Sequence, residues 1–263
     1  MLETYLRDRR KEKDILLMTH IVLGYPSFDD SLRMVEAMVK AGVDLMELQI
    51  PFSEPIADGP VILAANQKAL ETGAAVADCM KLAKTVSERF DIPFLFMTYY
   101  NILYRYGVSR FAEDMARHGM QGAIVPDLPP EEAGDYLDAM NGQNLSPIFI
   151  YSPTTSPERM KYLSGFGKGF IYCVARKGVT GAETRFSNDL EDYLGRCREA
   201  ADLPLAVGFG VKSKDDVDFL KGKADIAVVG SQTIRLMEEE GVEAVEEFIR
   251  GLTADNRDKS DEP

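Results

Sequence analysis

The chain has 263 residues, 45% of them hydrophobic, and a formal net charge of −13. This length suits one large domain or two small ones, and the apolar content is ample for a sizeable core. The acidic balance argues against nucleic acid and an anionic membrane surface as partners, because Lys and Arg must neutralise phosphate groups. The sequence also has no apolar run of about 18 residues, the length that predicts a membrane-spanning helix.

The cysteines and the two ends of the chain indicate the compartment. Cys79, Cys173 and Cys197 are widely spaced, which fits reduced thiols better than a disulfide framework or a zinc site. Residues 1–14 are charged and lack the apolar segment of a signal peptide. We therefore expect a cytoplasmic protein, with a polar tail over 254–263 that is disordered.

Short apolar runs that favour strands alternate with helical patterns along the whole chain. The expected strands are eight: 16–24, 43–50, 93–100, 122–127, 146–152, 169–175, 204–210 and 224–231. Helical patterns between them include 29–42, 109–119, 130–142, 191–200, 214–222 and 242–251. Strict alternation predicts a parallel sheet covered by helices, and eight repeats are typical of a (β/α)8 TIM barrel. An open doubly wound sheet is the alternative, but no GxGxxG motif follows the first strand. We predict one barrel domain over 1–263 with a short N-terminal helix.

The segment ELQIPFSEPIADGP, residues 47–60, carries the strongest chemical signal. Period-two alternation places Val43, Leu45, Glu47 and Gln49 on one face of the second strand. If that face lines the barrel, Glu47 is a carboxyl group in a largely apolar cavity. Asp58 follows in a Pro-rich loop before a Gly-Pro helix start, where a turn or helix cap is an equally good interpretation. Two acids without neighbouring His or Cys ligands suit proton transfer rather than metal binding.

Gly-rich stretches follow the last three strands, at 178–182, 208–210 and 229–231. Glycine lets a backbone approach a ligand closely, and helix N-termini bind phosphate without a formal positive charge. Ordinary turn formation explains these glycines equally well. The long polar segment 176–189 lies among them, and we expect it to form a lid over a substrate, with a surface loop as the alternative.

Other polar residues give weaker signals. His20 ends the first strand and could face the cavity, although a lone histidine is more often structural. His118 lies at a helix end and is expected to be a surface residue. Asn101 and Asp127 follow strands and are expected to make scaffold contacts.

Several motifs taken together resemble the alpha subunit of tryptophan synthase from about residue 16 to residue 250. They are ELQIPFSEPIADGPVI, MTYYNILYRYG, PDLPPEEA, RKGVTGAETR, GFGVKS and VVGSQTI, in the family's order and spacing. The resemblance implies a TIM barrel that cleaves indole-3-glycerol phosphate to indole and glyceraldehyde 3-phosphate without a cofactor or metal. It also implies a beta subunit as partner, in an alpha-beta-beta-alpha complex.

The resemblance implies roles for residues that match the family's motifs. Glu47 matches the acid/base that serves C3 of the indole and the side-chain hydroxyl, and Asp58 matches the acid that stabilises charge at the indole nitrogen. Tyr172 matches a supporting active-site tyrosine, which we count as catalytic. The residues matched to substrate binding are Phe209, Thr180, Gly181, Gly210, Gly230 and Ser231. Those expected to line the pocket are His20, Gln49, Phe96, Ile62 and Ile124.

Three positions depart from the family's usual pattern. Gln49 replaces glycine, Glu54 replaces aspartate and His20 replaces an aromatic residue that walls the indole pocket. Because Gln49 shares a face with Glu47, its side chain could intrude on the cavity. Two alternatives therefore stay open, namely a weakly active subunit that mainly activates a beta subunit and a related phosphate-binding lyase or isomerase.

Overall fold

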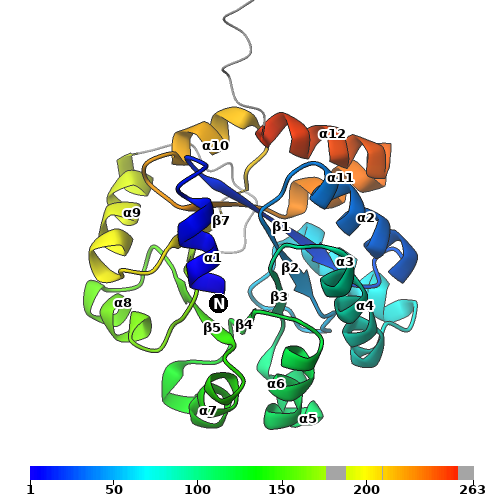
Figure 1. Cartoon of the computed structure of the whole chain (residues 1–263), viewed down its shortest axis with the longest axis horizontal. Coiled ribbons are helices and arrows are strands. Elements are labelled where there is room, and N and C mark those ends of the chain that lie inside the picture. Colours follow the sequence, from blue (N-terminus) through cyan, green and yellow to red (C-terminus); the bar gives the residue numbers. More distant parts are fainter. Residues whose placement is uncertain (176–187, 209, 254–263) are drawn as a thin grey trace, which may run out of the picture.

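The structure is a computed structural model that describes residues 1–175, 188–208 and 210–253. Parallel strands pair in chain order, and the last pairs with the first, so that the sheet closes into a barrel (Figure 1). The predicted TIM barrel is therefore confirmed. The strands are β1 (Leu16–Val22), β2 (Leu45–Gln49), β3 (Phe94–Met97), β4 (Gly122–Ile124), β5 (Ser146–Tyr151), β6 (Ile171–Val174), β7 (Leu205–Gly208) and β8 (Ile226–Val229).

Helices surround the barrel on its outer side (Figure 1). Between β2 and β3 the chain forms two helices in succession, so that an extra helix follows the loop that carries Asp58. The helices are α1 (Leu2–Arg9), α2 (Phe28–Lys40), α3 (Pro60–Glu71), α4 (Val76–Arg89), α5 (Tyr100–Tyr106), α6 (Val108–Arg117), η1 (Pro130–Glu132), α7 (Gly134–Gly142), α8 (Pro157–Ser164), α9 (Asn188–Ala200), α10 (Lys214–Leu220), α11 (Ser231–Glu240) and α12 (Val242–Thr253).

Apolar side chains form an outer layer between strands and helices and a separate cluster inside the barrel. On β3, Leu95 and Met97 belong to the interior cluster. Phe96 belongs to the outer layer, where its ring lies 5.9 Å from that of Phe111 on α6. The prediction that Phe96 lines the pocket is wrong, because alternation along the strand turns its side chain away from the barrel interior.

Helix α1 covers the amino-terminal end of the barrel and lies over its centre in Figure 1. Its Leu2 and Leu6 pack into the interior cluster. Asp44, just before β2, is buried and forms ion pairs with Arg9 at 3.1 Å and with Lys13 at 2.7 Å. With this end closed, the carboxyl ends of the strands are left for a binding site, as is usual for this fold.

Within residues 1–175, 188–208 and 210–253, no helix is both long and apolar enough to cross a membrane. The same residues contain no cluster of three His, Cys, Asp or Glu side chains placed to hold a metal ion. Cys79, Cys173 and Cys197 are all buried and unpaired as disulfides.

Candidate active site

Two polar side chains on β2, those of Glu47 and Gln49, are buried inside the barrel. Leu45 belongs to the interior cluster, and alternation gives Glu47 and Gln49 the same direction. The parallel register of β1 and β2 sets His20 beside Glu47. Val43, which we expected on this face, precedes the strand and packs in the outer layer.

His20 and Glu47 form a buried pair. The Nδ1 atom of His20 lies 2.9 Å from Oε1 of Glu47, and each side chain is only 4% exposed. Burial opposes the charged imidazolium, but the Glu47 carboxylate, and to a lesser extent Asp58 and Gln49, raise the pKa of His20 above its usual value. His20 was expected to face the cavity, and its buried ring contacts an acid.

Gln49 and Asp58 form a second buried pair. The Nε2 amide of Gln49 donates a hydrogen bond to Oδ2 of Asp58 at 2.6 Å. Burial raises the pKa of Asp58, whereas the hydrogen bond from Gln49, the charge of His20 and the contact with Tyr99 act in the opposite direction. Gln49 therefore holds the second acid through its amide.

The loop between β2 and α3 is fixed by contacts that sequence reasoning did not identify. Tyr99, two residues beyond the end of β3, accepts a hydrogen bond from the backbone N–H of Ala57 at 3.1 Å, and its ring stacks on Phe52 with centroids 5.0 Å apart. The buried Asn66 of α3 accepts a hydrogen bond from the N–H of Phe52 at 3.0 Å. These contacts hold the backbone on both sides of the loop and so place Asp58. Tyr99 follows the end of a strand, which is the signal that could have revealed it.

Tyr172 lies on β6, across the barrel from β2, and packs against the interior cluster. Burial raises its pKa well above the usual value, and the nearby Glu47 and Asp58 carboxylates raise it further. A Cβ atom at Gly208 would lie only 2.8 Å from the Tyr172 hydroxyl, so glycine is needed there for the ring to fit. Tyr172, which the family resemblance marks as a supporting active-site residue, therefore lies near both acids.

A family model described as tryptophan synthase alpha chain matches residues 6–260. The chain belongs to the tryptophan synthase alpha chain family. It is 65% identical over 252 residues to the tryptophan synthase alpha chain of Desulforapulum autotrophicum, covering 96% of this chain and 100% of that one. The corresponding protein of Syntrophotalea carbinolica gives the same identity and coverage.

Solved structures of tryptophan synthase have the same fold. A chain of the Mycobacterium tuberculosis tryptophan synthase superposes with a TM-score of 0.89 at 32% identity, covering 95% of this chain and 96% of that one. A mutant alpha subunit from Pyrococcus furiosus gives 0.83 at 30% identity, with coverage of 90% and 97%. As a member of the tryptophan synthase alpha chain family, the chain is a lyase of tryptophan biosynthesis that cleaves indole-3-glycerol phosphate to indole and glyceraldehyde 3-phosphate. Alpha chains of this family work with a beta subunit.

Those residues expected to bind the substrate that the structure describes lie at the carboxyl ends of the strands, like the two acid pairs. Gly230 follows β8 and precedes α11, which begins at Ser231. A Cβ atom on Gly230 would lie 3.5 Å from His20 and 3.7 Å from Ile62, so this helix start adjoins the acid pairs. Gly210 adopts a positive φ of 88°, which favours glycine.

The remaining predicted residues divide into three groups, which are interior residues, residues outside the described ranges and scaffold residues. Ile124 on β4 belongs to the interior cluster, as expected for a residue that lines the pocket. Thr180, Gly181 and Phe209 lie outside the described residues, as does most of the expected lid over 176–189. Asp127 accepts two hydrogen bonds from the backbone N–H of Tyr100, at 2.9 and 3.1 Å, and so caps the start of α5 as a scaffold contact.

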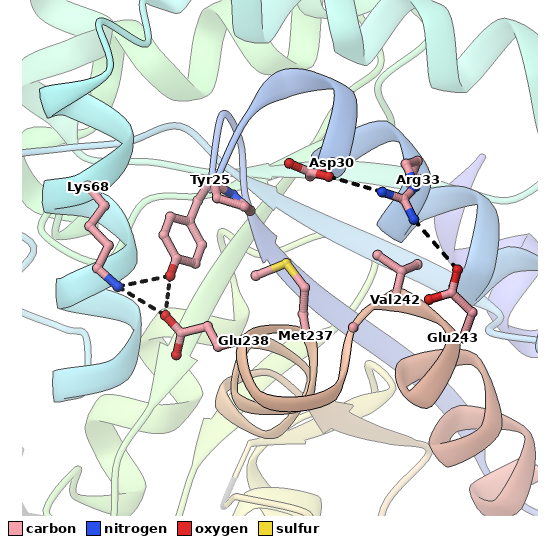
Figure 2. Close-up of a pocket in the computed structure, with 10 residues that line it drawn as sticks. Tyr25, Asp30, Arg33, Lys68, Met237, Glu238, Val242 and Glu243 are labelled. Atoms are coloured by element: carbon pink, nitrogen blue, oxygen red, sulfur yellow. Dashed lines mark hydrogen bonds and ion pairs between the residues drawn. The ribbon is translucent and has the colours of Figure 1, made fainter.

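A separate groove of about 650 Å³ lies outside the barrel and contains none of the predicted site residues. It lies between α2, α3 and the junction of α11 and α12 (Figure 2). In it, Lys68 donates hydrogen bonds to the Tyr25 hydroxyl at 3.1 Å and to Glu238 at 3.2 Å, and Tyr25 also donates to Glu238. We call these three residues the groove cluster.

Proposed function

We propose that Glu47 and Asp58 perform the cleavage of indole-3-glycerol phosphate in this chain. The observation that carries the proposal is the burial of both acids at the carboxyl end of the barrel, each held by its own partner. The carboxylates of Glu47 and Asp58 lie close enough to Tyr172 to raise its pKa, and Tyr172 supports the site from β6.

The reaction explains why two acids are needed. Cleavage of the bond to an aromatic indole requires a proton at C3, which leaves positive charge at N1. The side-chain hydroxyl then loses its proton as the carbon–carbon bond breaks, and indole and an aldehyde form. One proton therefore leaves the hydroxyl for each proton delivered to C3. Glu47 exchanges both protons, and an ionised Asp58 stabilises the charge at N1.

The phosphate group binds where the backbone N–H groups of α11 begin, at Gly230 and Ser231. A helix start attracts a dianion through its dipole and its unpaired N–H donors. Gly230 lies close to His20 and Ile62, so the phosphate site adjoins the acid pairs. A substrate with its phosphate at Gly230 therefore places its indole ring beside the acids. We also assign Gly210 to the phosphate site, and by their match to the family's motifs we assign Gly181 to the same site, Thr180 to the support of the acids and Phe209 to the recognition of the indole.

The partner is a tryptophan synthase beta subunit in an alpha-beta-beta-alpha complex. Two large apolar side chains are exposed on neighbouring segments after β2 and β3, with Ile56 72% and Tyr104 71% exposed. Such side chains at the mouth of the barrel suit a protein interface beside the site that releases indole. The complex acts in the cytoplasm, where the three buried thiols stay reduced.

Steady-state release of indole from indole-3-glycerol phosphate tests the two acids. We expect Glu47→Gln to lower kcat by more than about a hundredfold, or ~2.7 kcal/mol of barrier. Glu158→Gln is the matched control, because Glu158 is exposed on α8. Retention of a tenth or more of the wild-type kcat by Glu47→Gln would contradict the proposed role. An inactive wild-type chain that still stimulates a beta subunit would support the activator alternative instead.

A further inference from the structure

Each of the two acids in the barrel contacts its partner through one oxygen atom. Several polar atoms of the two pairs have no hydrogen-bond partner among the described residues. Oε1 of Glu47 contacts His20, whereas Oε2 of Glu47 is buried and has no hydrogen-bond partner in the described part of the chain. In the same part of the chain, Nε2 of His20 and Oε1 of Gln49 are also buried without a partner. Buried polar atoms are rarely left unpaired, so these three atoms indicate a cavity that receives a polar ligand.

We propose that His20 and Gln49 are positioning residues for the cleavage reaction. His20 fixes Oε1 of Glu47 and thereby aims Oε2 at the substrate, while Gln49 fixes Oδ2 of Asp58. The proposal rests on the proposed function of the two acids, and it assigns the atom of Glu47 that exchanges protons. Neither His20 nor Gln49 needs to contact the substrate for this role.

The directions of the hydrogen bonds favour a charged His20. Gln49 donates its amide to Asp58, so its oxygen is left as an acceptor. A doubly protonated His20 donates through Nδ1 to Glu47 and has a second donor at Nε2. Gln49 also helps to raise the pKa of His20. In this doubly protonated form His20 donates to Glu47 and carries a positive charge beside that carboxylate, whereas an uncharged His20 keeps only a neutral contact with Glu47.

The groups packed around His20 are few. Glu47 and Gln49 approach it from β2, and Asp58 from the following loop. On the other side, Gly230 at the start of α11 lies close to His20, and glycine does not titrate. Across the barrel, Tyr172 titrates well above the usual phenol range and stays neutral. The charge of His20 therefore depends on burial, which opposes it, and on the two acids, which favour it.

The pH dependence of kcat distinguishes positioning from a structural role. We expect kcat of the wild type to fall as the pH rises through the pKa of His20, because the positive charge that holds the Glu47 carboxylate is then lost. His20→Asn keeps a neutral donor near the place of Nδ1, so at every pH it should show about the kcat that the wild type keeps above the pKa of His20, without this alkaline fall. His20→Leu removes the donor and should lower kcat by about 10- to 100-fold, with a smaller change in KM. His118→Asn is the control, because it removes the other histidine of the chain.

Two results would overturn the proposal. The first is a folded His20→Leu variant with wild-type kcat, and the second is a His20→Asn variant that keeps the alkaline fall. Nuclear magnetic resonance titration of His20 adds a readout that does not need turnover, because Glu47→Gln should lower the pKa of His20, and an unchanged value would refute the pairing. Loss of activity in Glu47→Gln together with unaffected His20 variants would refute positioning alone. Equal turnover in the wild type and Glu47→Gln would refute the proposed function first.

Discussion

The barrel interior and the outer groove both contain carboxylates held by neighbouring side chains, but the surroundings differ. In the interior, His20 and Glu47 are each only 4% exposed. In the groove cluster, the side chains of Lys68 and Glu238 are 56% and 37% exposed (Figure 2). The atoms of the two pairs are separated by similar distances, 2.9 and 3.2 Å. Because water and salt screen the exposed pair, the same contact has a much weaker effect there.

The two regions also differ in whether a buried carboxylate oxygen is left without a hydrogen-bond partner. Glu238 is shared by Tyr25 and Lys68, so the groove cluster satisfies its own charges. In the interior, Oε2 of Glu47 is left without a partner within the described residues. A buried carboxylate with a free oxygen can react with a substrate, whereas an exposed carboxylate in mutual contacts serves to join α3 to α11. Burial with incomplete pairing therefore marks the reactive region of this molecule.

Among the variants that test this comparison, Gln49→Leu should change activity most, because it removes the hydrogen-bond donor to Asp58. The hydrogen bond from Gln49 opposes the rise in the pKa of Asp58 that burial causes. Without it the pKa of Asp58 rises further, so the carboxylate forms only at higher pH. We expect the acid limb of kcat/KM to move to higher pH and kcat/KM at pH 6 to fall about tenfold or more, because a hydrogen bond to a charged group contributes about 1.5–3 kcal/mol.

Gln49→Gly separates this view from simple obstruction of the cavity. If Gln49 positions Asp58, the glycine variant should lose activity in the same way as Gln49→Leu. Tighter binding of the substrate by the glycine variant, with undiminished kcat, would show instead that the side chain obstructs the site. Substrate affinity measured by equilibrium titration decides between the two outcomes.

A smaller effect is expected in the pH dependence of stability. The pKa of His20 is raised in the folded chain, so the folded state holds this proton more tightly than the unfolded state. Its contribution is complete below the unfolded pKa of about 6.5 and is lost as the pH rises through the folded pKa. His20→Asn should therefore lower the free energy of unfolding by about 1–2 kcal/mol at pH 6 and by less at pH 9. Urea unfolding at both pH values measures the difference, and an equal loss at both would contradict it.

The sequence predicts much of this site but not its pairings. Alternation along β2 correctly places Glu47 and Gln49 inside the barrel, because a charged residue on a buried strand identifies the inner face. The same reasoning fails for Phe96, since both faces of β3 are apolar and only the packing on α6 fixes its direction. The contact of His20 with Glu47 depends on the register between β1 and β2, which hydrophobic periodicity does not encode.

The smallest effect should come from Glu238→Gln in the groove cluster. The hydrogen bond from Tyr25 and the charge of Lys68 lower the pKa of Glu238, so its contribution is present above about pH 4.5 and is lost as the pH falls through the folded value. This direction is opposite to that of His20. Since the pair is exposed, we expect a loss of at most about 1 kcal/mol at pH 7, smaller still in 1 M salt, with kcat unchanged. A loss as large as that of a buried pair, or a fall in kcat, would show that α3 and α11 transmit the state of the groove to the phosphate end of the site.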